Sequence, residues 1–153
     1  SQVKQPGQSP LQQDLQNQLQ FNRQVPIYLV TRKEILMCRE VEYPLTLGME
    51  ANLDELLKRI NAFRWKYGKP LQVSSGYRPG TYNSAVGGAK NSSHLTCEAV
   101  DFADGDRAIT RYILANPEIL VQCDLWMESP IDTPTWVHLS SRPVASGNRI
   151  FGK

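Results

Sequence analysis

The sequence predicts an α+β fold in which helices flank one small antiparallel sheet. Helical and strand-like segments are mixed without the regular alternation that a parallel doubly wound sheet requires. The clearest helical pattern lies at 52–68, where apolar residues follow one helix face. Two short apolar runs, at 123–129 and 135–141, have the length of strands and are expected to pair as neighbours.

Residues 1–25 are rich in glutamine, so they are predicted to form a flexible tail outside a domain of residues 26–153. Within this segment Leu11, Leu15 and Leu19 recur every fourth residue, which is the spacing of one helix face. Two interpretations stay open. The segment folds onto its own domain, or it docks on a protein partner.

Two helix starts carry N-cap chemistry. Thr31 precedes a helix predicted over 32–38, with Glu34 in the reciprocal position of a capping box. Asn52 is predicted to open the long helix that ends at Gly68. The apolar stripe of that helix, interpreted as core, consists of Leu53, Leu56, Leu57, Ile60 and Phe63.

Extended segments or strands are predicted at 25–30 and 71–77, and the second delivers Tyr77 and Arg78 to its far end. The glycine-containing stretch 79–92 follows. It lacks the spacing of a phosphate-binding loop, so we interpret it as the wall of a cleft.

The C-terminal half contributes two more helices. Either Asp104 or Asp106 is expected to cap the first, and a short helix is predicted over 117–123. The chain ends in a basic segment in which Ile150 and Phe151 are expected to pin it to the core.

Length and charge exclude several classes of protein. The 153 residues fit one domain with an independent core. A net charge of +2 without a basic run argues against nucleic acid as a partner. No apolar stretch approaches the ~20 residues of a membrane span.

The cysteines and the N-terminus bear on the compartment. Cys38, Cys97 and Cys123 are odd in number and form no Cys-x-x-Cys pair, so buried free thiols are favoured over pairing with another chain. The first residues lack the apolar core of a signal peptide, from which we expect synthesis in the cytoplasm.

Both histidines of the chain lie in segments that suit a metal site. His94 is followed seven residues later by Asp101, and His138 lies in the predicted strand TWVHLSS. A catalytic zinc site takes three protein ligands from His and Asp or Glu and keeps a fourth position open. These three residues supply that set. Because side chains alternate along a strand, the odd separation of His94 and Asp101 requires a turn, which we place at 95–98.

The blocks SGYRPGTYN and SSHLTCEAVDF, with Trp-Val-His far downstream, resemble the zinc D-Ala-D-Ala carboxypeptidase family of murein peptidases. That family is grouped with lysostaphin-type enzymes and the hedgehog domain, and the likeness covers roughly residues 50–142. It implies that the cofactor is Zn²⁺, bound by His94, Asp101 and His138. Cys97 stands where many members have glycine.

The resemblance also implies roles for residues beyond the metal ligands. Arg78 would contact the substrate, either by holding a terminal carboxylate or by polarising the scissile carbonyl. Glu128, in DLWMESP, is the candidate catalytic base. Ser92 and Tyr77 are expected as further substrate contacts.

The function that this resemblance implies is a zinc metallopeptidase acting on bacterial peptidoglycan, with stem peptides as its partners and a zinc-activated water as nucleophile. Two scissile bonds remain possible: the terminal D-Ala-D-Ala bond, for a carboxypeptidase, and a bond within the stem, for an endopeptidase. A second class stays open too: a zinc-stabilised structural or binding module, such as a virion component. Bacteriophage origin, as a lysis or virion-borne enzyme, would explain how a protein without a signal peptide acts at the cell wall.

Overall fold

A computed structural model describes residues 7, 9–24 and 29–152, and it confirms the α+β architecture. The described strands form one five-stranded sheet in the order β1-β2-β4-β3-β5. Neighbours run antiparallel except β3 and β5, which are parallel. The strands are β1 Val73–Ser75, β2 Ala99–Ala103, β3 Trp126–Glu128, β4 Trp136–Ser140 and β5 Ile150–Phe151.

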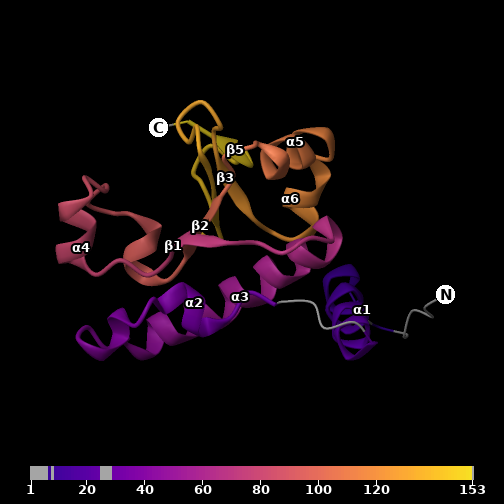
Figure 1. Ribbon diagram of the computed structural model, residues 1–153, viewed down its shortest axis with the longest axis horizontal. Coiled ribbons are helices and arrows are strands. Elements are labelled where there is room, and N and C mark those ends of the chain that lie inside the picture. Colours follow the sequence, from indigo (N-terminus) through magenta and orange to yellow (C-terminus); the bar gives the residue numbers. More distant parts are fainter. Residues whose placement is uncertain (1–6, 8, 25–28, 153) are drawn as a thin grey trace.

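The helices surround this sheet. The long α3 crosses below it with α2 alongside, while α4 lies at one end of the molecule and α5 and α6 at the other (Figure 1). The α-helices are α1 Pro10–Gln24, α2 Arg32–Leu36, α3 Leu47–Tyr67, α4 Gly80–Ala85, α5 Ala108–Ala115 and α6 Glu118–Gln122. Two 3₁₀ helices are η1 Arg39–Val41 and η2 Ser93–Thr96.

Helix α2 confirms the predicted capping box. The Thr31 hydroxyl accepts a hydrogen bond from the backbone of Glu34, and the Glu34 side chain accepts one from the backbone of Thr31. The helix ends two residues earlier than predicted because Met37 takes a left-handed conformation, φ 56°.

The start of α3 was predicted wrongly. Thr46 is the N-cap, its hydroxyl accepting a hydrogen bond from Met49 N at 3.1 Å, and the helix begins at Leu47. Asn52 lies inside the helix and donates to Thr96 O. The predicted end at Gly68 is confirmed, with φ 78°. The core face is also confirmed: Leu53, Leu56, Ile60 and Phe63 are fully buried and Leu57 is partly buried.

Helix α1 lies against α3. Leu11 and Leu15 are partly buried against the core, and Asp14 pairs with Lys66 of α3 at 2.8 Å. The division into tail and domain stays a prediction. The strand predicted at 25–30 falls largely outside the described residues, and 29–30 lie in no regular element.

Three local predictions change in the structure. The stretch interpreted as a cleft wall at 79–92 begins with α4, and Val86 to Ala89, which follow this helix, line the cleft. Both candidate caps of α5 serve: the Asp104 carboxylate accepts from the backbone of Ile109 and Thr110, and Asp106 accepts from Ala108 N. The C-terminal segment adds β5, which pairs with β3.

The two strands predicted as neighbours are confirmed as β3 and β4. Strand β2 pairs with the other edge of β4, in a register that sets Asp101 opposite His138. Among the described helices, none is long and apolar enough to cross a lipid bilayer.

Candidate functional site

Three side chains from different elements meet beside the middle of the β2–β4 ladder. His94 comes from η2, where the Ser92 hydroxyl accepts a hydrogen bond from His94 N at 3.2 Å. Asp101 lies on β2 and His138 on β4. All three are buried, and one potential ligand atom from each lies within 4.8 Å of the others. The turn predicted at 95–98 is present, with η2 followed by Cys97 in a left-handed conformation.

Hydrogen bonds fix how the two rings face the carboxylate. His94 Nδ1 donates to the carbonyl oxygen of Gly76 at 2.8 Å, which leaves the lone pair on Nε2. That Nε2 is buried and makes no hydrogen bond within the described part of the chain, although it lies 3.3 Å from Asp101 Oδ2. His138 Nδ1 lies 2.9 Å from Asp101 Oδ1.

The protonation states suit metal ligation. Burial lowers the pKa of His94, which keeps its imidazole neutral at neutral pH. Burial alone would raise the pKa of Asp101, but the adjacent imidazoles of His138 and His94 outweigh it and hold that pKa well below its ordinary range. A neutral imidazole and an ionised carboxylate are the forms that bind a metal.

The donor set therefore fits zinc. Ligand atoms around a tetrahedral zinc ion lie about 3.3 Å apart, given bonds of about 2.0–2.1 Å. His94 Nε2 lies 3.3 Å from Asp101 Oδ2, and His138 Nδ1 lies 2.9 Å from Asp101 Oδ1, and both distances are close to this spacing. Two imidazoles and one carboxylate are a catalytic set, because they leave a fourth position for water or substrate.

The three residues open onto a cleft of about 600 Å³. Apolar side chains and backbone form much of its wall, and polar groups lie near the candidate ligands. Besides His94, Asp101 and His138, the lining includes Arg78, Val86, Gly87, Gly88, Ala89, Asn91, Ser92, Ser93, Glu128, Trp136, Ser140, Arg142, Pro143, Val144 and Phe151.

Arg78 reaches the cleft from the segment after β1. Its backbone N–H donates to His94 O at 3.1 Å, so this segment and η2 are directly joined. The side chain is half-buried, and its Nε has no hydrogen-bond partner within the described residues. Burial lowers the pKa of Arg78, while the charges of Asp101 and Glu128 oppose that shift. The guanidinium is thus held beside the candidate metal ligands with a donor left over.

Of the other predicted site residues, two line the cleft and one does not. Glu128, at the end of β3, and Ser92 both line the cleft. Tyr77 does not: it is 3% exposed and its hydroxyl donates to Tyr43 O at 3.1 Å. Tyr77 therefore lies in the core, and it is the next residue, Arg78, that faces the cleft.

Several residues at the site were not predicted. Phe151 of β5 meets the His138 ring edge to face, with centroids 6.2 Å apart. Trp136 lines the cleft two residues before His138, and the alternation of side chains along a strand could have indicated this. Arg142 and the Gly76 carbonyl carry no local signal, since their partners come from distant segments.

Comparison with known proteins adds one positive finding. A family model described as Peptidase M15 matches residues 29–116, more than half of the chain. The matched range includes Arg78, His94 and Asp101 and ends before Glu128 and His138. Among curated proteins, none matches the chain.

Proposed function

The chain belongs to the peptidase M15 family, and on this premise we propose that it is a zinc-dependent peptidase that cleaves peptide bonds of bacterial cell-wall peptidoglycan. The observation that carries the proposal is the buried group of His94, Asp101 and His138 at a cleft that also contains Glu128 and Arg78. Its substrates would be stem peptides, and it would act at the cell wall.

The three ligand residues would hold the metal in a fixed geometry. A bound zinc ion would supply a Lewis acid that polarises the scissile carbonyl and lowers the pKa of water at the site. The Gly76 carbonyl fixes the tautomer of His94, and the pairing of β2 with β4 holds Asp101 opposite His138. The ligand set is therefore preorganised by the chain's own hydrogen bonds.

Glu128 is the acid–base residue of this proposal. Its carboxylate would take a proton from the attacking water and return it to the leaving amine, a role worth about 10²–10⁴ in rate. The end of β3 suits this role, since β3 is the neighbour of the strand that carries His138, and Glu128 lines the same cleft.

Arg78 is the substrate-binding residue. The planar guanidinium presents paired donors that match a carboxylate, and its half-buried position shields the contact from water. The terminal carboxylate of a D-Ala-D-Ala stem would satisfy the Nε that lacks a partner among the described residues. Ser92, on the same cleft wall, would add a neutral hydrogen bond.

Digestion of purified murein tests this function. Zinc-loaded protein is compared with chelator-treated protein and with His94→Ala, which should lose stoichiometric zinc because one of two imidazole ligands is removed. Mass spectrometry then identifies the products. Metal-dependent release of free D-alanine would establish a carboxypeptidase, and stem or cross-link fragments an endopeptidase. Protein that holds one zinc per chain and releases no product would reject the peptidase and favour a zinc-stabilised binding module.

A further inference from the structure

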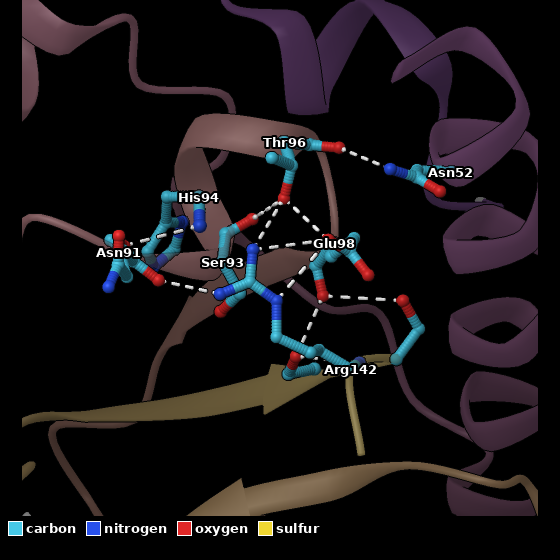
Figure 2. A network of polar contacts seen from close by, with 10 residues as sticks. Asn52, Asn91, Ser93, His94, Thr96, Glu98 and Arg142 are labelled. Atoms are coloured by element: carbon cyan, nitrogen blue, oxygen red, sulfur yellow. Dashed lines mark hydrogen bonds and ion pairs between the residues drawn. The ribbon is translucent and has the colours of Figure 1, made fainter. Parts of the chain in front are cut away.

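Arg142 lies just beyond β4 and joins two segments that are far apart in the sequence. Its Nη1 donates to Asn91 O at 2.6 Å, its Nη2 to Thr96 Oγ1 at 2.8 Å, and its Nε and Nη2 to Glu98 Oε1 at 3.3 and 3.1 Å. Figure 2 shows the guanidinium surrounded by these acceptors. We refer to Asn91, Thr96, Glu98 and Arg142 as the Arg142 clamp.

The clamp connects the two segments that carry the histidine ligands. His94 lies between Asn91 and Thr96, and His138 lies four residues before Arg142. The carbonyl oxygen of Glu98 joins the same two segments, because it accepts hydrogen bonds from Ser140 Oγ and Ser141 N, both at 2.9 Å. Contacts outside the ligand set therefore join the two segments that carry the histidines.

The clamp also surrounds a strained point of the chain. Cys97 has φ 62°, a left-handed conformation that is unfavourable for a residue with a Cβ. Thr96 and Glu98, on either side, are held by the guanidinium and by each other, with Thr96 Oγ1 donating to Glu98 Oε1 at 2.6 Å. On the far side, Asn52 of α3 donates to Thr96 O, which fixes η2 to the core helix.

Arg142 differs from the other arginine of the cleft in how its donors are used. All three of its guanidinium nitrogens have protein acceptors, whereas the Nε of Arg78 has none among the described residues. An arginine whose nitrogens are all engaged with the protein is suited to fix geometry, and one with a spare donor is suited to bind a ligand.

We propose that Arg142 and Glu98 are positioning residues that set the distance between His94 and His138 and thereby the zinc affinity of the site. The inference rests on the proposed function, since it concerns the same metal centre. Residues that orient metal ligands from outside the coordination sphere affect metal affinity by about 10- to 100-fold.

The test is the zinc dissociation constant of the purified full chain, measured by competition with a chromophoric chelator. Arg142→Gln, Arg142→Lys and Glu98→Gln are each expected to bind zinc about 10- to 100-fold more weakly than the wild type. Lysine should not rescue, because one ammonium group cannot span acceptors on three residues. Arg142→Gln/Glu98→Gln should be no weaker than Arg142→Gln alone, as expected of groups that act as a unit.

Thermal unfolding of the metal-free proteins separates positioning from general support of the fold. Arg149→Gln is the matched control: Arg149 pairs with Asp124 at 2.9 Å, is similarly half-buried and does not line the cleft. It should bind zinc like the wild type even if its melting temperature falls. If Arg142→Gln does not fold, Arg142→Lys and Glu98→Gln carry the test.

Three results would overturn the inference, and they differ in what they imply for the function. Wild-type zinc affinity in folded clamp variants would reject the positioning role alone, as would an affinity loss matched by Arg149→Gln. Wild-type protein that binds no zinc would reject the proposed function as well.

Discussion

The imidazole of His94 donates from Nδ1 to the carbonyl oxygen of Gly76, 2.8 Å away. Gly76 can hold this position only without a side chain, because a Cβ there would overlap the backbone carbonyl of Ile35 in α2. The same carbonyl of Ile35 accepts a hydrogen bond from Tyr77 N. One ligand of the proposed metal centre is thus oriented by a backbone that packs directly against a helix.

Gly76→Ala is therefore expected to destabilise the protein. Backbone atoms must move to admit the methyl group, and overpacking of this kind costs about 1–3 kcal/mol or more. Chemical denaturation measures the change in the free energy of unfolding. Gly105→Ala is the control, since a Cβ there meets no atom within 4 Å. If both variants had the same free energy of unfolding, the backbone around Ile35 would accommodate the methyl group without a measurable cost.

Glu128→Gln should retain zinc and lose at least about a hundredfold in kcat, because the amide keeps the shape of the side chain but cannot accept the proton. Metal content and turnover are measured on the same preparation. Glu118→Gln, at an exposed position of α6, serves as the control for loss of one negative charge. Near-normal turnover of Glu128→Gln would place the base on another residue.

Arg78→Lys should lower kcat/KM by roughly 10- to 100-fold, the equivalent of about 1.5–3 kcal/mol for a hydrogen bond to a charged group. The loss should appear on peptides with a free C-terminal carboxylate and be smaller on C-terminal amides. Arg111→Lys, at an exposed position, controls for the substitution itself. Equal losses on acid and amide would assign Arg78 to the scissile carbonyl instead.

Alkylation should distinguish the three cysteines. Burial raises the pKa of Cys97 and of Cys123 to about 12, so neither forms the reactive thiolate near neutral pH. Cys38 is exposed. Iodoacetamide at pH 8 should add one label per native chain and three after denaturation, as read by mass spectrometry. A second label on the native chain would mean that η2 or α6 opens readily.

Removal of residues 1–25 should leave kcat unchanged, since none of the described residues among them, 7 and 9–24, lines the cleft. Stability should fall by about 1–3 kcal/mol, because the partial burial of Leu11 and Leu15 against the core is lost. Leu15→Ala and the exposed Leu19→Ala form a matched pair, of which only the first should lower the melting temperature. A truncated chain that no longer folds would make α1 part of the domain.

Local chemistry was the predictable part of this fold. The Thr31–Glu34 capping box and the left-handed Gly68 each depend on a few neighbouring residues, and both were found from the sequence. The start of α3 was not, because Thr46 and Asn52 both have cap chemistry. The choice is made by a distant contact, in which Asn52 is drawn to Thr96 O.

The candidate site shows the same division. The three candidate ligands were predicted from residue type and a family resemblance, and the structure places them together. The direction of Tyr77 could not be predicted, because a short extended segment allows either of two adjacent side chains to face the cleft. The role of Arg142 was equally hidden, since its acceptors at 91–98 approach only when β2 pairs with β4.

The opposition of Asp101 and His138 across β2 and β4 also has a consequence for how the chain matures. These residues are 37 positions apart, so the ligand set does not exist until a long-range strand pairing is made, which is a slow kind of contact in folding. Zinc would then bind the native state and not the unfolded chain, and by mass action its concentration would shift the folding equilibrium. The moment at which zinc is taken up during refolding would therefore report when these two strands pair.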